Sequence, residues 1–206
     1  MTDPIYQDMI RHSIRATLIA FAAIAVSCPR LPAVEPVDMS LSDNINIPAV
    51  GKRSKEKVRS RMASLRRELS KAGMTVTSLR DGEVMMVTVA ADKLFAPNSS
   101  ELKPSASAFL DKFADIIKDP DDYKILVAVH TDDTGDDFYA DNITGDRANA
   151  IDTYMTAISG RDTINLIPYG LGRDEPLVDN NSIKSRRTNR RIEIYIVPGE
   201  TLAKAR

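Results

Sequence analysis

Segments with the spacing of β-strands alternate with segments that have the spacing of α-helices along the last two thirds of this 206-residue chain. The strand-like segments are residues 74–78, 83–90, 125–130, 163–169 and 191–196. Residues 125–130 are almost entirely apolar, as expected of a strand covered on both faces, whereas residues 191–196 alternate and predict a half-buried strand. Asp81-Gly82 lies between the first two segments and predicts a β-hairpin. Strands that alternate with helices predict an α/β (α+β) sandwich with helices packed on the sheet.

Three segments have the apolar spacing of amphipathic helices. The first covers residues 54–72, closes at Gly73, and has an apolar stripe formed by Val58, Met62, Leu65 and Leu69. The second has Pro104 in its first turn and a stripe formed by Ala106, Leu110, Phe113 and Ile117. The third is capped by Thr144, ends at Gly160, and has an inward side formed by Ala148, Ile151, Met155 and Ile158.

The outer face of the first helix is basic. It carries Lys52, Arg53, Lys55, Lys57, Arg59, Arg61, Arg66, Arg67 and Lys71. Such a face is compatible with contact to an anionic lipid surface or to a cell wall, and a solvated helix face is the commoner explanation. The formal net charge of the whole chain is only −1, so the global balance gives no argument for a nucleic-acid partner.

The N-terminal region predicts an export signal. Residues 16–28 are uncharged and mostly apolar, follow Arg11 and Arg15, and are too short to span a bilayer as a helix, which needs about 20 residues. Cys28, the only cysteine of the sequence, follows three small residues, and the arrangement resembles a bacterial lipobox. That resemblance implies lipidation of Cys28. Cleavage after Ser27 by the ordinary signal peptidase and an uncleaved anchor are the alternatives.

Two further expectations concern the region around this signal. Asp3 and Asp8 make residues 1–8 a poor start for an export signal, whereas Met9 opens a compact cationic stretch, and we expect Met9 to be the natural initiator. Residues 29–53 contain four prolines and predict a semi-extended linker.

Most patterns of catalytic residues are absent from the sequence. One cysteine and two histidines do not form a common zinc motif, and there is no Gly-x-Ser-x-Gly, Walker or His-Glu-x-x-His pattern. His130 lies on an apolar strand, where a histidine is more often structural than a ligand. The acidic loop 132–137 does not have the glycine position or the closing glutamate of an EF-hand. A looser metal site in this loop stays as an alternative.

Two charged residues, Asp132 and Arg147, occupy positions that favour a ligand site. Asp132 follows the end of a buried strand, where ligands of α/β sheets bind, and Arg147 falls in the first turn of the helix that Thr144 is expected to cap. An acid and an arginine that converge suit a ligand with both an ammonium and a carboxylate group. An internal ion pair between Asp132 and Arg147 explains the spacing equally well.

A set of short motifs spans residues 84–198 in a fixed order. The motifs are Phe95, Asn98-Ser-Ser-Glu-Leu102, His130-Thr-Asp132-x-x-Gly135, Arg147-Ala148, Gly170-x-Gly172, Pro176 and Arg186-x-x-Asn189-Arg190-Arg191. Each motif alone is weak, but the combination resembles the OmpA C-terminal-like family, which also occurs in peptidoglycan-associated lipoproteins and flagellar stator proteins. The resemblance implies a βαβαβ mixed sheet with helices on one face.

The resemblance also implies a ligand and a site. Family members bind the diaminopimelate residue of peptidoglycan stem peptides without cleaving it. By motif match, Asp132 receives the ammonium group of the ligand and Arg147 its carboxylate. The other residues that the match places at the site are Thr134, Gly135, Arg186, Asn189 and Arg190, the last three bordering or supporting it. Ala140 stands where the family usually has Asn, and Asn142 is the nearest substitute, so affinity or stem-peptide preference is expected to differ.

These observations predict a non-enzymatic lipoprotein of the outer membrane whose domain binds peptidoglycan in the periplasm and tethers membrane to wall. A wall-anchoring module of an envelope secretion or motility complex, with further protein partners, is the alternative; a metal-dependent envelope enzyme is a second. No cofactor is expected, and the basic C-terminal motif is not expected to bind nucleic acid. The predicted divisions are export segment 1–28, linker 29–53, basic helix and hairpin strand 54–83, peptidoglycan-binding domain 84–198 and tail 199–206.

Overall fold

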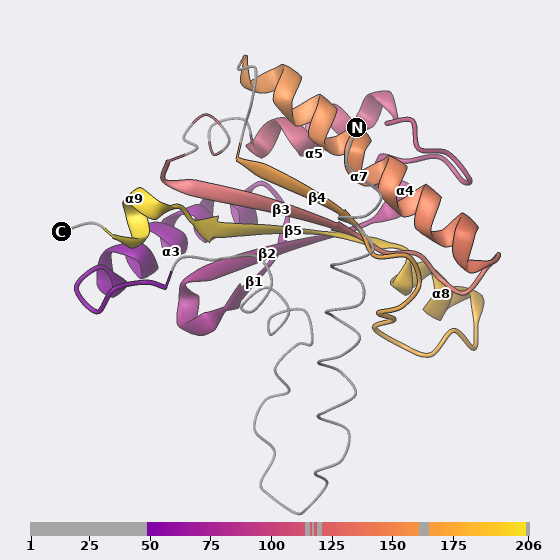
Figure 1. Ribbon diagram of the computed structural model, residues 1–206, viewed down its shortest axis with the longest axis horizontal. Helices are drawn as coiled ribbons and strands as arrows, with labels where there is room; N and C mark the ends of the chain where they lie inside the picture. Colours follow the sequence, from indigo (N-terminus) through magenta and orange to yellow (C-terminus); the bar gives the residue numbers. More distant parts are fainter. Residues whose placement is uncertain (1–48, 114–115, 117, 119–120, 161–164, 205–206) are drawn as a thin grey trace, which may run out of the picture. The chain divides into compact units, whose positions relative to one another are not determined.

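Five strands form one mixed sheet in the computed structural model of this chain, which describes residues 49–113, 116, 118, 121–160 and 165–204 (Figure 1). The strands are β1 Thr75–Leu79, β2 Val84–Ala90, β3 Tyr123–Val129, β4 Leu166–Gly170 and β5 Arg191–Pro198. Their order is β1-β2-β5-β3-β4, and each neighbouring pair is antiparallel except β3 and β4, which are parallel. The predicted mixed α/β sheet is confirmed.

The predicted basic helix and hairpin are present. Helix α3 covers Lys55–Lys71 and buries three members of its apolar stripe, Val58, Met62 and Leu69. The hairpin joins β1 to β2, with Leu79 opposite Val84. Its loop uses consecutive positive φ angles at Arg80, Asp81 and Gly82, conformations that Asp and Gly adopt more easily than most residues.

The helices pack on the face of the sheet that carries Ile192, Ile194 and Ile196. Side chains of α3, of the segment 104–116 and of α7 (Asp137–Ser159) form one apolar core with these isoleucines. The remaining short elements are α4 Ala91–Leu94, η2 Pro104–Ala106, α5 Ser107–Leu110, η3 Asp111–Phe113, α8 Ile183–Asn189 and α9 Glu200–Ala203. Of the predicted second stripe, Ala106, Leu110 and Phe113 are buried, Ile117 lies outside the described residues, and Ile116 is buried beside them.

The start of the long helix was predicted wrongly. Helix α7 begins at Asp137, because the Asp136 side chain caps it by accepting a hydrogen bond from the Tyr139 N–H at 2.7 Å. Thr144 is therefore inside the helix, and its hydroxyl donates to the Ala140 carbonyl one turn earlier at 2.8 Å. Arg147 consequently lies in the third turn, too far from the helix start for the helix dipole to act there. The predicted end at Gly160 is confirmed, in a left-handed conformation (φ 67°).

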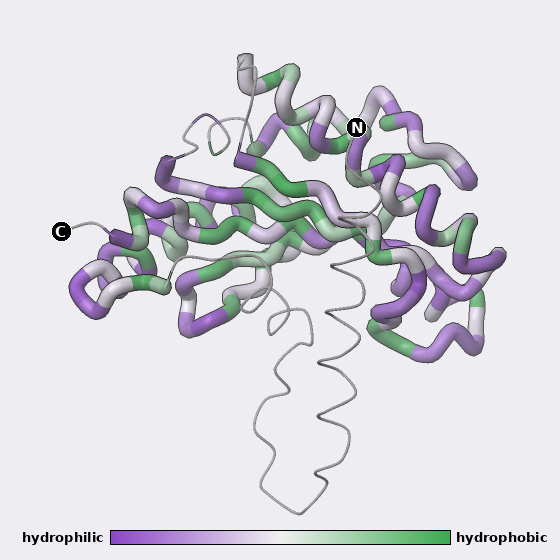
Figure 2. The backbone as a smooth tube through the Cα atoms, viewed as in Figure 1, coloured by the Kyte–Doolittle hydropathy of each residue, from purple (hydrophilic) through white to green (hydrophobic). Residues whose placement is uncertain are grey.

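The prediction of a half-buried final strand is also wrong. Strand β5 lies between β2 and β3, and every residue from Arg191 to Pro198 is buried. The hydrophobic residues of the described chain concentrate along the strands, as Figure 2 shows. The alternation of Arg191, Glu193 and Tyr195 with isoleucines reflects a second buried face that is polar, because these side chains hydrogen-bond to one another.

Within the described ranges, no helix has the length and apolar content needed to cross a bilayer. The predicted export segment, with Cys28, and most of the predicted linker lie outside those ranges. The described chain from residue 49 to Ala203 falls within one compact unit, in which the Gly51 N–H donates to the Ala203 carbonyl at 3.3 Å. Helix α3 and strand β1 therefore share a core with the sheet.

Candidate ligand-binding site at the end of the sheet

The candidate site lies at the end of the sheet where β3 and β4 finish and β5 begins, next to α8 in Figure 1. Backbone hydrogen bonds hold the converging segments together. The His130 N–H donates to Arg191 at 2.9 Å, and the Thr131 N–H donates to Gly172 at 2.8 Å. Asp132 is thereby fixed directly after β3, where the sequence predicted a ligand crevice.

Asp132 is almost completely buried and forms an ion pair with an arginine other than the expected one. Its exposed fraction is 2%, one carboxylate oxygen pairs with the Arg190 guanidinium, and the other accepts the Thr134 N–H at 2.9 Å. The Arg190 side chain is 38% exposed, so it covers the carboxylate from the solvent side. The ion pair that the sequence left open for Arg147 is thus made by Arg190.

Arg147 is buried without a carboxylate partner among the described residues. It is 5% exposed and rests over the Phe95 ring, with 5.2 Å between its guanidinium carbon and the ring centroid. Its Nε donates to the Ser99 carbonyl at 2.9 Å, and its Nη2 lies 3.4 Å from the Ala96 carbonyl. Burial lowers the pKa of the Arg147 guanidinium, and the nearby positive charge of Arg190 acts in the same direction. Arg190 thus pairs with Asp132 and also acts electrostatically on Arg147.

The other carboxylates of the acidic loop are occupied by arginines or by a helix cap. Asp133 pairs with Arg186 at 2.8 Å, which lowers the pKa of the Asp133 carboxyl. Asp137 pairs with Arg173 at 2.7 Å, and the same guanidinium donates to the Gly135 carbonyl at 3.0 Å. Among the described residues, no group of three or more His, Cys, Asp or Glu side chains is arranged to hold a metal ion.

Comparison with known proteins identifies the part of the chain that builds this site. Residues 94–190 match the model of the OmpA family. These residues form an OmpA-family domain. The resemblance that the sequence motifs indicated is confirmed, and the matched range contains Asp132, Arg147 and Arg190.

Relatives and solved structures agree with this assignment. The chain is 33% identical over 107 residues to outer-membrane lipoprotein YfiB of Pseudomonas aeruginosa (52% of this chain, 62% of the relative) and 26% identical over 136 residues to probable lipoprotein YiaD of Escherichia coli (66% and 61%). It therefore spans less than two thirds of either relative. The cell wall anchor of the type VI secretion system from P. aeruginosa superposes with a TM-score of 0.56 at 26% identity, covering 68% of this chain and 99% of that one. A MotB-like protein from Desulfovibrio vulgaris shares the fold, with a TM-score of 0.60 at 24% identity (69% and 95%).

The remaining residues that the motif match assigned to the site have different positions in the OmpA-family domain. Thr134 and Gly135 form the loop above Asp132, and a Cβ at Gly135, whose φ is +90°, would lie 2.9 Å from the Tyr139 ring. Asn142 is exposed on α7 and donates to the Phe138 carbonyl at 2.8 Å. Asn189 is fully buried, and its amide group exchanges hydrogen bonds with the backbone of Val178. Asn189 therefore supports the loop before α8 instead of facing solvent.

Sequence reasoning missed the partners of these residues. Arg190 was placed near the site, but its pairing with Asp132 was not predicted, and neither was the contact of Arg173 with the acidic loop. Ala140, which replaces the usual Asn, is fully buried beneath the helix start. The one available signal was the excess of arginines in the C-terminal motif, two of which, Arg186 and Arg190, pair with acids of the loop once the chain is folded.

A buried polar network lies beneath the site on the second face of the sheet. Glu193 accepts hydrogen bonds from Arg191 at 2.6 Å and from the Tyr195 hydroxyl at 2.5 Å, and its carboxylate lies 3.5 Å from the His130 ring nitrogen Nε2. Burial acts to raise the pKa of the Glu193 carboxyl, but His130 and Arg191 lower this pKa to about 2. Burial lowers the pKa of His130. His130 is therefore neutral at neutral pH, and neither of its buried ring nitrogens has a hydrogen-bond partner among the described residues.

The partly buried Glu175 carboxyl should make the stability difference between the wild type and a Glu175→Gln variant depend on pH. Burial, reinforced by the charge of Glu193, raises the pKa of the Glu175 carboxyl from 4.5 to about 6. A raised folded pKa contributes stability that is complete below the unfolded pKa and is lost as pH rises through about 6. The Glu175→Gln variant resembles the protonated group, so its free energy of unfolding should exceed that of the wild type by about 2 kcal/mol at pH 7.5 and match it at pH 4.5.

Urea denaturation of both proteins at the two pH values measures this difference. His130 makes an opposing contribution: because its pKa is lowered in the folded protein, it removes stability as the pH falls below the ordinary pKa of histidine. This contribution is the same in the wild type and the variant, so it cancels in the comparison. An Asp174→Asn variant is the matched control, because Asp174 is the exposed neighbour of Glu175. A stability difference between Glu175→Gln and wild type that does not change with pH would contradict the prediction.

Proposed function

We propose that this OmpA-family domain binds peptidoglycan non-covalently through the diaminopimelate of the stem peptide, and so holds an envelope protein to the cell wall. The observation that carries the proposal is two guanidinium groups, that of Arg147 buried and that of Arg190 partly exposed, beside one buried carboxylate. Asp132 neutralises one positive charge, and Arg147 has no carboxylate partner among the described residues. A buried unpaired cation is costly, and a ligand carboxylate is the group that would neutralise it.

The same arrangement accounts for the ammonium group of the ligand. Arg190 covers Asp132 and is partly exposed, so its guanidinium can leave the carboxylate when a ligand ammonium takes its place. The ligand then presents its carboxylate to Arg147, whose position is fixed by Phe95 and by the Ser99 carbonyl. The exchange keeps Asp132 paired throughout, which avoids the penalty of a buried unpaired charge. The domain would act by binding alone, and the proposal includes no catalytic step.

The proposed setting is the bacterial envelope, with the domain in the periplasm and a lipid on Cys28 as the membrane anchor. Two relatives are named as lipoproteins, and one of these as an outer-membrane lipoprotein, which supports this setting. A second candidate function, wall anchoring within a larger secretion or motility complex, is favoured by the similarity to the cell wall anchor of the type VI secretion system. Both functions use the same site and differ in the partners of the chain.

Pull-down of the full chain on purified sacculi that contain diaminopimelate tests the proposed function. We expect saturable binding that free diaminopimelate competes away, because it offers the ammonium and carboxylate groups of the stem peptide. Free lysine, which lacks the second amino-acid end, is the matched competitor and should compete less. Binding should also persist in a chelator, with unchanged muropeptides. A folded domain that does not bind sacculi would refute the proposal, and chelator-sensitive cleavage would favour the enzyme alternative.

A further inference from the structure

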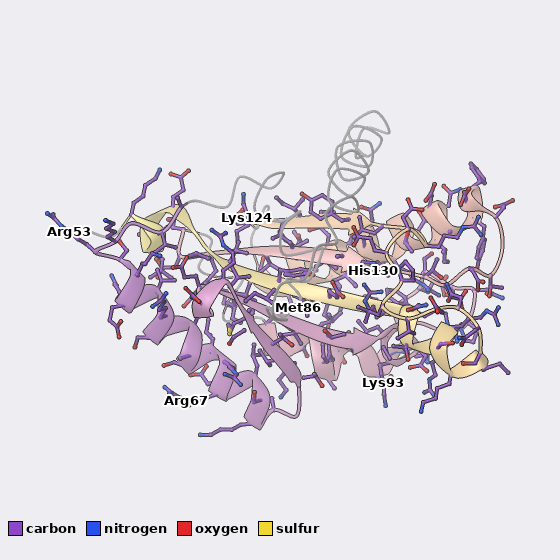
Figure 3. All side chains as sticks on the ribbon, turned by 90° about the horizontal axis from the view of Figure 1, so that it is seen from below. Arg53, Arg67, Met86, Lys93, Lys124 and His130 are labelled. Carbon is purple, nitrogen blue, oxygen red and sulfur yellow. The ribbon has the colours of Figure 1, made fainter. Side chains whose placement is uncertain are left out.

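A row of basic side chains along helix α3 and the turn before it faces away from the domain. Arg53, Lys57, Arg67 and Lys71, with Ser60 and Ser64 between them, are separated by steps of four and three residues, which place them on one side of a helix. We call the four basic residues the cationic ridge. Val58, Met62 and Leu69 lie on the opposite side of the helix and are buried. Figure 3 shows the labelled side chains pointing outward, Arg67 from α3 and Arg53 from the turn before this helix.

The charge of this ridge is not neutralised by the described part of the domain. Residues 52–71 contain nine basic and two acidic residues, although the formal net charge of the whole chain is −1. Two nearby carboxylates form ion pairs with basic residues on the flank of the helix. Glu83 pairs with Lys55 at 3.4 Å, and Asp81 pairs with Arg59 at 3.3 Å. No ridge residue pairs with a carboxylate of the described chain. The ridge is thus a concentrated positive surface on a chain whose remainder is acidic.

The ridge starts at the end of the sheet opposite the candidate ligand site, where Lys55 of α3 pairs with Glu83 just before β2. Strand β2 begins beside the hairpin next to α3, and its last residue, Ala90, is followed by Ala91, which bonds to Arg190 at the site. The eight-residue strand β5 runs between the two ends, a length of about 25 Å. The α3 end is also where the described chain starts, at residue 49.

We propose that the cationic ridge docks on a bilayer surface that carries anionic phospholipid headgroups. Charge complementarity favours this occupant, because serines and long basic side chains that pair with no described carboxylate suit a dense layer of phosphates. The surface is separate from the ligand site, and the proposal does not depend on what that site binds.

Vesicle co-sedimentation tests the proposal with the full chain carrying Cys28→Ser, so that no lipid is attached. Vesicles of phosphatidylcholine alone are compared with vesicles that contain about one third phosphatidylglycerol, a fraction sufficient for a negative surface potential. We expect the protein to bind the anionic vesicles preferentially, and added salt to weaken this binding. Each Lys or Arg near such a surface contributes about fivefold in binding. Replacing all four ridge residues with Gln should therefore weaken binding about 100-fold or more.

A charge-matched variant separates the ridge from the overall charge. It replaces four exposed basic residues elsewhere, Lys93, Lys118, Lys184 and Arg187, with Gln. This variant should bind anionic vesicles within about twofold of wild type, because charges away from the surface are screened. Equal loss in the two variants, or equal binding to neutral and anionic vesicles, would overturn the proposal. Sacculus pull-down is run in parallel: a ridge variant that loses sacculi but keeps vesicles would show that the helix contacts the wall, which also overturns it.

Discussion

The Asp132→Asn variant should bind diaminopimelate-containing sacculi at least about 30-fold more weakly than wild type. Asn keeps the shape of the side chain and can still accept the Thr134 N–H, but it removes the charge that pairs with Arg190 and with the proposed ligand ammonium. Removing one partner of a buried charge pair costs about 2–5 kcal/mol in binding. The measurement is the dissociation constant from quantitative pull-down, with circular dichroism to show that the variant is folded.

Arg147→Lys should reduce the same affinity by a similar factor. Lysine keeps a positive charge, but it cannot hold the Ser99 carbonyl and also offer two parallel N–H groups to a carboxylate. Asp137→Asn is the control for both variants, because Asp137 is an exposed acid of the same loop that pairs with Arg173 on the surface. Exposed pairs contribute little, so this control should bind like the wild type. Normal sacculus binding by folded Asp132→Asn would contradict the proposed ligand geometry.

The Gly170→Ala variant should lose about 3 kcal/mol or more in its free energy of unfolding. Gly170 ends β4 where that strand touches α7, and a Cβ there would lie 2.4 Å from the Gly145 nitrogen and 2.8 Å from the Thr144 carbonyl carbon. Both atoms belong to helix backbone, so relief of the clash requires the strand and helix to move apart. The separation would also break the hydrogen bond from the Gly172 N–H to the Thr144 hydroxyl. Urea denaturation followed by circular dichroism measures the loss.

Gly145→Ala is the matched control for this contact. Gly145 lies inside α7, and a Cβ at this position would have no heavy atom within 4 Å outside its own helix. Alanine is the better helix former, so the variant should gain about 0.5–1 kcal/mol in stability. The two glycines that touch each other are therefore expected to respond in opposite directions. Similar stability changes in both variants would show that the close approach of β4 to α7 is not as the structure has it.

Local sequence patterns were sufficient for most elements of the fold. The apolar stripe of α3, the Asp81-Gly82 hairpin and the buried strand β3 were predicted because each depends on neighbours within a few residues. The start of α7 was missed because two residues competed for the role of cap. Asp136 caps the helix, and Thr144 satisfies its hydroxyl with the Ala140 carbonyl inside the helix.

The candidate site could be predicted from the sequence only in part. The motif match located Asp132, Arg147 and Arg190 within one domain, but the sequence did not decide which arginine pairs with Asp132. That pairing joins residues 58 positions apart and depends on where β5 enters the sheet. The sequence also suggested a half-exposed β5, because alternation does not distinguish a solvated face from a polar face that is buried.

The sequence by itself determined the alternation of strands and helices, the family, the basic helix and the residues available for a site, since these follow from periodicity and from ordered motifs. Only the tertiary structure decided that Arg190 covers Asp132, that Arg147 is buried without a carboxylate partner among the described residues, and that no described carboxylate pairs with the cationic ridge. The physical reason is that pairing and burial of charges depend on segments far apart in the chain, which meet only when the sheet assembles.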